Sequence, residues 1–393
     1  WNAPGKWEKY LEDWQNEGIN CMERLQELIQ RTETIQKVNA LQQNVAKQLF
    51  TYPVLGKKEK TKRRIRKYLL FQQIPPVDRF YWPNALLARG LSEICRGTSD
   101  NVSINTLERY FNRWIKQEMP IYYVDNITNG IPLLDLYERT GNEKYMTGAQ
   151  RLAAYLLKYP ADSRGNLPYR LRDGSHIYAD GIGMICPFLC RYGILTEDTT
   201  AVKLSVVQMV HFLEGGMDEA SGLPYHGFDS DTGVKYGIIG WGRAVGWLMS
   251  GISESLAYLP EKTPQFSFLR DHFQKLSAIV VGFQKEDGSF PWQLQAQEGH
   301  RDTSAEGMIG YGAWLAAETA AVQRSEQWSP ALSRLAAIMQ TSIRDGRVTD
   351  CSGECKGFAE YPQVYGTYPW GSGSALAFLA VQLFREENND RAE

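Results

Sequence analysis

Three aspartates of this chain stand at the start of apolar segments that have aromatic residues nearby. Asp125 opens the segment DNITNGIPLLDLYERTG, Asp180 opens DGIGMICPFLCRYG, and Asp302 opens DTSAEGMIGYGAWLAAE. Carboxylates among aromatic rings are typical of glycosidase sites, because acid and base groups flank the scissile bond while rings stack on the apolar face of the sugar. The pattern therefore predicts acid–base chemistry on a saccharide.

Further polar and aromatic residues near these segments are candidates for binding a sugar. They are His176, Tyr225, His226, Trp241, Arg243, Trp247 and Trp370. Arg243 is the hardest of them to explain as a purely structural residue, because an Arg on an apolar helix is costly to bury without an anion beside it. It therefore predicts an anionic partner at the start of its helix.

Each candidate also has a structural interpretation. Asp125 and Asp180 precede apolar helices, where they could be N-caps that accept hydrogen bonds from unpaired backbone N–H groups. Helix patterning alone supports the cap and the catalytic interpretation equally for these two, whereas for Asp302 it favours the cap. His176 and His226 could be structural histidines.

The elements that would position these residues are helices, since apolar residues recur at i, i+3 and i+4 almost throughout the chain. Six segments rich in small and apolar residues start near Trp82, Asp125, Asp180, Trp241, Asp302 and Trp370. Amphipathic segments between them include Thr106–Gln117, Glu143–Lys158, Phe268–Val281 and Ser329–Thr341. This alternation predicts an all-α protein with six inner and six outer helices, an (α/α)6 barrel whose polar clusters meet at one end. An open helical solenoid is the alternative.

The N-terminal residues 1–73 are predicted to be a helical extension that packs on a catalytic barrel of residues 74–393. The extension includes a helix over Glu8–Leu28, and one of its helices is expected to complete the outer ring. It also contains a basic cluster between Lys57 and Lys67. A solvated helix face is favoured for this cluster over a site that grips an anionic polymer.

Composition excludes several classes of partner. The net charge of −2 gives no general attraction to nucleic acid. No stretch approaches the roughly 20 uninterrupted apolar residues of a membrane span, so no membrane insertion is predicted. The chain begins at Trp1 rather than at a methionine. A removed leader would explain this, so an extracytoplasmic location is slightly favoured over a cytoplasmic one, while the oligomeric state stays open.

The six cysteines do not indicate a disulfide scaffold or a metal site. Cys186 and Cys190 lie inside an apolar run, which favours a place in the core over metal binding. Cys351 and Cys355 flank a predicted turn and could close a small disulfide in an oxidising compartment. No metal or organic cofactor is predicted.

Four parts of the sequence, in this order and spacing, are similar to a known family. They are VDNITNGIPLLDLYERTGNEKY; YADGIGMICPFLCRYG; SGLPYHGFD followed by WGRAVGWLMSGI; and DTSAEGMIGYG with YPWGSGSALAFLA. On these segments the chain, from about Phe80 to its C-terminus, resembles the unsaturated rhamnogalacturonyl hydrolases of glycoside hydrolase family 105. It resembles the unsaturated glucuronyl hydrolases more distantly.

The resemblance implies a bacterial (α/α)6-barrel hydrolase that needs no metal or cofactor. Its substrates would be oligosaccharides released by polysaccharide lyases, here from the rhamnogalacturonan of pectin, from which it would remove a terminal 4,5-unsaturated uronic acid. Asp180 would be the general acid and base, Asp125 its essential partner carboxylate, and His226, Trp241 and Arg243 pocket residues. The chain departs from the family at Gly181, Ala244 and Val245, so the identity of the sugar that is released with the rest of the oligosaccharide stays open.

The implied reaction is a hydration of the C4=C5 double bond rather than a displacement at the anomeric carbon. Three alternatives remain at this stage. A conventional inverting glycosidase would use Asp125 and Asp180 as base and acid on a saturated glycoside. A sugar epimerase on a related barrel would rely on histidine pairs, and this chain has only five His. A non-catalytic oligosaccharide-binding module would use the aspartates only as caps.

Overall fold

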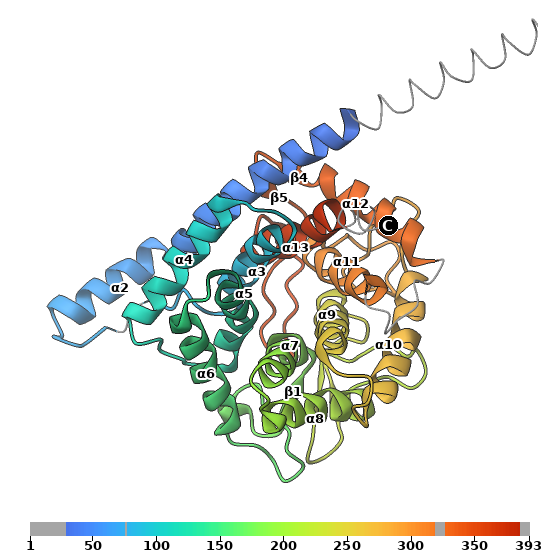
Figure 1. Ribbon diagram of the computed structural model, residues 1–393, viewed down its shortest axis with the longest axis horizontal. Coiled ribbons are helices and arrows are strands. Elements are labelled where there is room, and N and C mark those ends of the chain that lie inside the picture. The colour runs from blue at the N-terminus through green and yellow to red at the C-terminus, as the bar shows by residue number, and fades with distance from the viewer. Residues whose placement is uncertain (1–28, 75–76, 319–326, 386–393) are drawn as a thin grey trace, which may run out of the picture.

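The computed structural model describes residues 29–74, 77–318 and 327–385. Its helices form two concentric rings (Figure 1). The inner ring consists of α3 (Trp82–Gly97), α5 (Gly130–Thr140), α7 (Ala179–Leu195), α9 (Gly242–Tyr258), α11 (Thr303–Glu318) and α13 (Pro369–Phe384). A short 3-10 helix, η1 (Val124–Asn129), leads into α5.

The inner ring is closed, because α13 packs along α3 as extensively as any other pair of neighbours packs. The chain therefore forms an (α/α)6 barrel, as predicted, and the open solenoid is excluded. The six inner helices begin within a few residues of the predicted starts. Their apolar residues are buried nearly all round, which explains why these segments lack a polar face.

The outer ring contains α4 (Asn101–Lys116), α6 (Glu143–Leu157), α8 (Thr199–Gly215), α10 (Phe266–Val281) and α12 (Trp328–Thr341). Four of these were predicted. The sequence analysis missed α8, whose only charged residues are Lys203 and Glu214, so that its apolar and polar faces contrast weakly.

A helix over residues 29–51 takes the sixth outer position, between α4 and α12 (Figure 1). Its Gln42 donates to Asp100, the N-cap of α4, over 2.6 Å, and its Thr34 donates to Gln340 of α12 over 2.6 Å. The predicted helix Glu8–Leu28 lies outside the described residues. The boundary between residues 73 and 74 remains a prediction.

Glycines set the close approach of neighbouring inner helices. A Cβ atom on Gly251 of α9 would lie 2.9 Å from the backbone of Gly183 in α7. The same holds where α3 meets α13, since a Cβ on Gly373 would lie 2.5 Å from the backbone of Leu86. Larger side chains at these crossings would push the ring apart.

A buried ion-pair network closes the end of the barrel at which the inner helices finish. Asp135 of α5 accepts from Arg96 of α3 at 2.6 Å and from Arg191 of α7 at 2.5 Å. Burial alone would raise the pKa of Asp135, but these two guanidinium groups hold it well below its usual range. Arg89 likewise pairs with Glu254 of α9 and contacts Tyr311 of α11. The network ties five inner helices together.

The opposite end carries the loops and short strands. β1 (His176–Tyr178), β2 (Gly227–Asp229) and β3 (Lys235–Tyr236) form an antiparallel sheet in that order. Two smaller hairpins pair β4 (Ile343–Arg344) with β5 (Arg347–Val348) and β6 (Cys351–Ser352) with β7 (Tyr365–Gly366).

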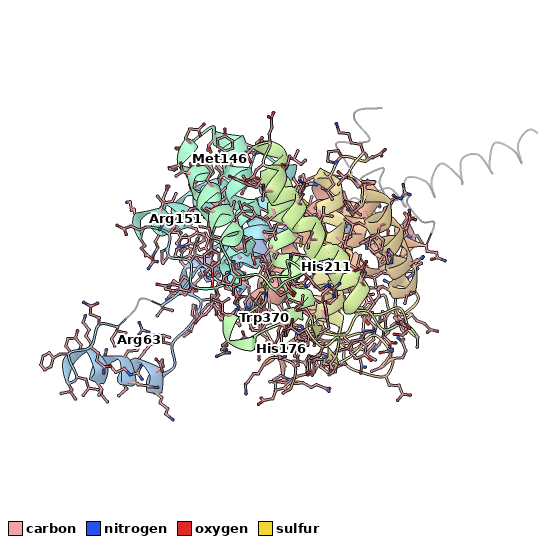
Figure 2. All side chains as sticks on the ribbon, turned by 90° about the horizontal axis from the view of Figure 1, so that it is seen from below. Arg63, Met146, Arg151, His176, His211 and Trp370 are labelled. Atoms are coloured by element: carbon pink, nitrogen blue, oxygen red, sulfur yellow. The ribbon has the colours of Figure 1, made fainter. Side chains whose placement is uncertain are left out.

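The helix α2 (Lys57–Tyr68) stands out from the barrel and, over its whole described length, has no buried residue (Figures 1 and 2). Among the described residues, no helix is both long and apolar enough to cross a bilayer.

Candidate active site

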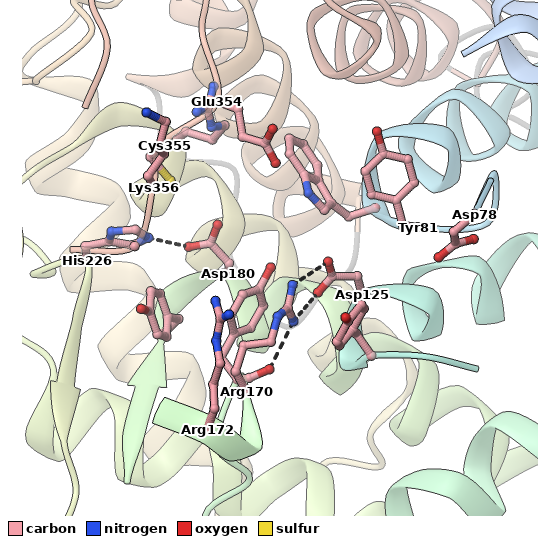
Figure 3. Close-up of a pocket in the computed structure, with 16 residues that line it drawn as sticks. Asp78, Tyr81, Asp125, Arg170, Arg172, Asp180, His226, Glu354, Cys355 and Lys356 are labelled. Atoms are coloured by element: carbon pink, nitrogen blue, oxygen red, sulfur yellow. Dashed lines mark hydrogen bonds and ion pairs between the residues drawn. The ribbon is translucent and has the colours of Figure 1, made fainter. Parts of the chain in front are cut away.

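A cavity of about 410 Å³ opens at the end of the barrel where the inner helices begin (Figure 3). Both predicted catalytic aspartates, Asp125 and Asp180, line it together with His226 and Arg243. The other lining residues are Asp78, Tyr81, Trp82, Tyr123, Tyr169, Arg170, Arg172, Tyr178, Glu354, Cys355, Lys356 and Gly357. Four carboxyl groups and several cationic and aromatic side chains therefore share one opening.

Asp180 sits in the first turn of α7 but does not cap that helix. The N-cap is Tyr178, and no side chain caps the helix there. Oδ2 of Asp180 lies instead 3.0 Å from Nε2 of His226, which is 1% exposed. The structure thus removes the cap interpretation and leaves the carboxylate facing the cavity.

The sheet explains why His226 reaches Asp180. The β1–β2 pairing sets Tyr178 opposite Gly227, and the backbone N–H of Ala179 donates to the carbonyl of His226 over 2.9 Å. The start of α7 is therefore fixed beside residue 226. This contact joins two of the sequence motifs that carried the family resemblance.

A tyrosine on the far side of His226 fixes the imidazole ring. The hydroxyl of Tyr361 lies 2.7 Å from Nδ1 of His226, and burial raises the pKa of this phenol. When the protonated phenol donates to Nδ1, the proton of the neutral imidazole is on Nε2 and points at Asp180. The rings of Tyr178, Trp241 and Phe358 surround the imidazole at centroid distances of 4.6 to 5.3 Å.

Asp125 is held by an arginine that the sequence analysis did not select. Both oxygens of this carboxylate accept from Arg170, over 2.7 and 2.8 Å, in a bidentate pair. Burial alone would lower the pKa of Arg170, but the bonds to Asp125 raise it above its ordinary value. In Figure 3 the guanidinium lies on the side of Asp125 that faces Asp180. The N-cap of η1 is Tyr123 and that of α5 is Asn129, so Asp125 does not act as a helix cap either.

Arg243 has the anionic neighbour that its burial predicted, but its hydrogen bonds run to uncharged groups of the protein. Its Nη1 atom lies 4.0 Å from Oδ2 of Asp302 and donates to Oγ of Ser352 over 3.1 Å, while Nη2 donates to the carbonyl of Gly353 over 2.9 Å. The side chain of Asp302 accepts from the backbone N–H of Ser304 over 3.0 Å, which agrees with a capping role. Arg243 thus fixes Ser352 and Gly353, while it also lines the cavity.

The remaining predicted residues do not line the cavity. Trp241 is 1% exposed and packs on His226 and Arg243, so it supports the site from behind. Trp247 and Trp370 are buried around Trp82, at centroid distances of 6.4 and 5.0 Å.

Two further predicted residues lie to the side of the cavity. His176 faces Asp229, 3.7 Å away, and the ring of Tyr236. Tyr225 faces Lys235. Direct contact of these residues with a sugar in the cavity is not supported by their positions, although their assignment as substrate-binding residues remains a prediction.

Several lining residues were missed because their sequence signals are short and mixed. Arg170 and Arg172 stand in YRLRDGSHIYAD, the segment that leads into Asp180. The arginines beside a tyrosine, so close to a candidate catalytic aspartate, were the signal that could have identified them as site residues. Glu354 lies in a segment that was interpreted only as a turn. Burial raises the pKa values of Glu354 and of Asp78, and Asp125 raises both further.

Of the two cysteine predictions, one is confirmed and the other is wrong. Cys186 and Cys190 are buried in α7 beside Ser205, as expected of core residues. Cys351 and Cys355 are both free thiols, so the suggested small disulfide is wrong. Cys351 lies in β6 and is buried against Gly371, whereas Cys355 lies in the loop after β6 and lines the cavity. In the described ranges, no group of three His, Cys, Asp or Glu residues could hold a metal ion.

The family model of Glycosyl Hydrolase Family 88 matches residues 57–383 of this chain, a span that includes every cavity residue. The chain belongs to this family. It is a glycosidase, and the family resemblance found in the sequence is confirmed.

Individual relatives agree with this assignment. The chain is 25% identical over 318 residues to the unsaturated rhamnogalacturonyl hydrolase YesR of Bacillus subtilis, an alignment that covers 77% of this chain and 89% of the relative. A possible member of the GH105 family from Klebsiella pneumoniae has the same fold, with a TM-score of 0.78 at 18% identity over 89% of this chain and 94% of the other. The unsaturated glucuronyl hydrolase of Bacillus sp. GL1 gives a TM-score of 0.67 at 15% identity, covering 91% and 97%.

Proposed function

We propose that this glycosidase removes a terminal 4,5-unsaturated uronic acid from oligosaccharides produced by polysaccharide lyases. The observation that carries the proposal is the hydrogen-bonded pair of Asp180 and His226 in a cavity that also contains arginines and aromatic rings. Family membership and the relative named as an unsaturated rhamnogalacturonyl hydrolase support the substrate class. A rhamnose-linked pectin fragment is the favoured substrate.

In the proposed reaction Asp180 delivers its proton to C4 of the C4=C5 enol ether and then helps a water molecule add at C5. The resulting hemiketal opens, and the rest of the oligosaccharide leaves as an alcohol. His226 orients the carboxyl group through the bond to Oδ2, and this orientation is fixed from behind by Tyr361. The Arg170–Asp125 pair fixes the opposite wall.

The direct test uses the chromophore of the substrate. We expect the purified protein to remove the ultraviolet absorbance of the uronate double bond from lyase-treated rhamnogalacturonan. A saturated oligosaccharide of the same length is the control and should not be cleaved. Cleavage of the saturated control at a comparable rate would instead support a conventional glycosidase.

Heavy water separates hydration from displacement at the anomeric carbon. Because Asp180 exchanges its proton with solvent between turnovers, the reaction in heavy water should leave one deuterium on C4 of the released uronate. C4 lies beside the C5 ketone of the opened product and exchanges slowly near neutral pH, whereas hydroxyl deuterium exchanges at once, so prompt mass spectrometry after return to ordinary water should show the label. An ordinary glycosidase protonates the glycosidic oxygen and releases the uronate with its double bond intact, so no deuterium enters carbon in the cleavage step. An unlabelled product would therefore contradict the hydration mechanism.

Arg243→Lys tests whether the cavity-facing side of Arg243 binds the carboxylate of the sugar. An ammonium keeps the charge but loses the planar fork that donates to Ser352, Gly353 and a bound carboxylate, so we expect KM to rise by about tenfold. The free energy of unfolding should fall by about 1–2 kcal/mol, because buried carbonyls lose their donor. If kinetics match the parent while only stability falls, Arg243 is a structural residue alone.

A further inference from the structure

The segment of residues 54–71, which we name the basic arm, is not used by the proposed reaction. It consists of α2 and the residues on either side of it. Figure 2 shows the arm, marked by Arg63, standing out from the barrel on the side of His176. By the usual helical rise α2 spans about 18 Å. The tetrapeptide that ends the arm exposes its side chains: Tyr68 64%, Leu69 69%, Leu70 56% and Phe71 88%.

The arm differs in charge from the rest of the molecule. The sequence of α2 contains eight basic residues and one acidic residue, a formal charge of +7, whereas the whole chain carries −2 and the remainder therefore −9. Basic side chains concentrated on one projecting element create a local positive potential that an otherwise acidic protein lacks. The occupant that this potential favours is an anion with several charges along its length.

The residues just before the arm are anchored at the rim of the cavity. The ring of Tyr52, just before the arm, stacks on that of Tyr81 with centroids 6.1 Å apart, and Nη1 of Arg79 donates to the carbonyl of Tyr52 over 2.5 Å. Tyr81 and Asp78, which follow the arm in the sequence, both line the cavity. A chain that leaves the cavity past this wall therefore meets the root of the arm.

We propose that the basic arm is a second binding surface for the substrate, one that takes the uronate carboxylates of an acidic oligosaccharide beyond the cavity. This inference rests on the proposed function, since it assigns the remote part of the same anionic substrate. The lysines and arginines pair with carboxylates, and the exposed Tyr68 and Phe71 offer rings for the apolar faces of the sugars.

The position of the arm determines which substrates should bind more tightly because of it. We expect a disaccharide to occupy the cavity alone and leave the arm unoccupied, and a longer acidic chain to reach both. At 0.1 M ionic strength, salt largely screens the attraction between exposed charges that lie more than about 10 Å apart. The advantage of the long substrate over the disaccharide should therefore shrink as salt is added.

The test compares two triple variants that each lose three positive charges. Lys58→Gln, Lys62→Gln and Arg66→Gln change one face of the arm, while Lys203→Gln, Lys262→Gln and Lys275→Gln change exposed lysines around α8 and α10. In 20 mM salt, the arm variant should raise KM for an unsaturated hexasaccharide with repeating uronates by about fivefold. The KM of the arm variant for the matching unsaturated disaccharide should stay within about twofold of the parent value. The KM values of the control variant for both substrates should do the same.

A binding measurement separates this proposal from the reaction itself. Calorimetric titration with saturated oligogalacturonate, which lacks the double bond, should show weak, salt-sensitive binding to the parent protein that the arm variant loses. Failure of the protein to consume any unsaturated substrate would contradict the proposed function without affecting this result. Equal KM changes for hexasaccharide and disaccharide, or none for either, would overturn the arm as a substrate surface.

Two other occupants of the arm would also overturn the proposal. If the parent protein sediments with vesicles of phosphatidylglycerol, and the arm variant does not, the arm binds an anionic membrane. If the parent protein is a dimer by light scattering and the arm variant a monomer, the arm binds the acidic barrel of a second copy. Either result in combination with unchanged kinetics on the hexasaccharide assigns the arm to that partner.

Discussion

Replacing Asp180 with Asn is expected to lower kcat on an unsaturated oligosaccharide by about a thousandfold while the protein stays folded. The amide keeps the size of the side chain and can still face Nε2 of His226, but it cannot deliver a proton to carbon. Because Asp180 does not cap α7, its replacement should leave the helix intact. The measurements are the loss of double-bond absorbance and the far-ultraviolet circular dichroism spectrum.

A matched control comes from Asp198, which begins an outer helix as a true cap. Its side chain accepts from the backbone N–H groups of Thr200 and Ala201. Asp198→Asn should leave kcat unchanged, since Asn also caps helices. If Asp180→Asn kept more than about a tenth of the parent kcat, another carboxyl group of the cavity, with Glu354 the first to examine, would have to supply the proton.

Replacing Arg170 with Gln is expected to affect both activity and stability. It leaves the carboxylate of Asp125, which is 3% exposed, without its bidentate partner. An unpaired buried charge is costly, so the free energy of unfolding should fall by about 3 kcal/mol in urea denaturation. We expect kcat/KM to fall by about a hundredfold, because the freed Asp125 loses its fixed position on the cavity wall.

Two further variants separate these effects. Arg164→Gln breaks an exposed contact with Glu214, 3.9 Å away, and should change stability by less than about 0.5 kcal/mol. The double variant Asp125→Asn, Arg170→Gln removes both charges and should recover most of the lost stability. If it also recovered activity, Asp125 would be a structural residue rather than the essential partner carboxylate that the family resemblance implies.

Much of the fold could be predicted from the sequence because it depends on local patterning. Inner helices of a double ring are buried on all sides, so their sequences are apolar all round and rich in small residues, as in the segments that begin near Trp241 and Trp370. Outer helices have one buried face and therefore an amphipathic pattern, as in α4 and α12. Where the contrast between faces is weak, as in α8, the prediction failed.

The same patterning located the cavity, but not the partners of its residues. Polar clusters at the starts of the inner helices indicated that Asp125, Asp180, His226 and Arg243 lie at one end of the barrel, and the structure places all four around one cavity. Helix patterning could not distinguish a cap from a catalytic carboxylate. That distinction depends on which group faces the carboxylate from another element.

The sequence by itself therefore determined the ring of helices and the end at which the polar residues gather. Only the tertiary structure decided that Arg170 holds Asp125, 45 residues away, that Tyr361 fixes His226, 135 residues away, and that Arg243 donates to Gly353, 110 residues away. The physical reason is that helix periodicity is set by neighbours within one or two turns. Hydrogen-bond partners across the cavity are set by closure of the whole ring.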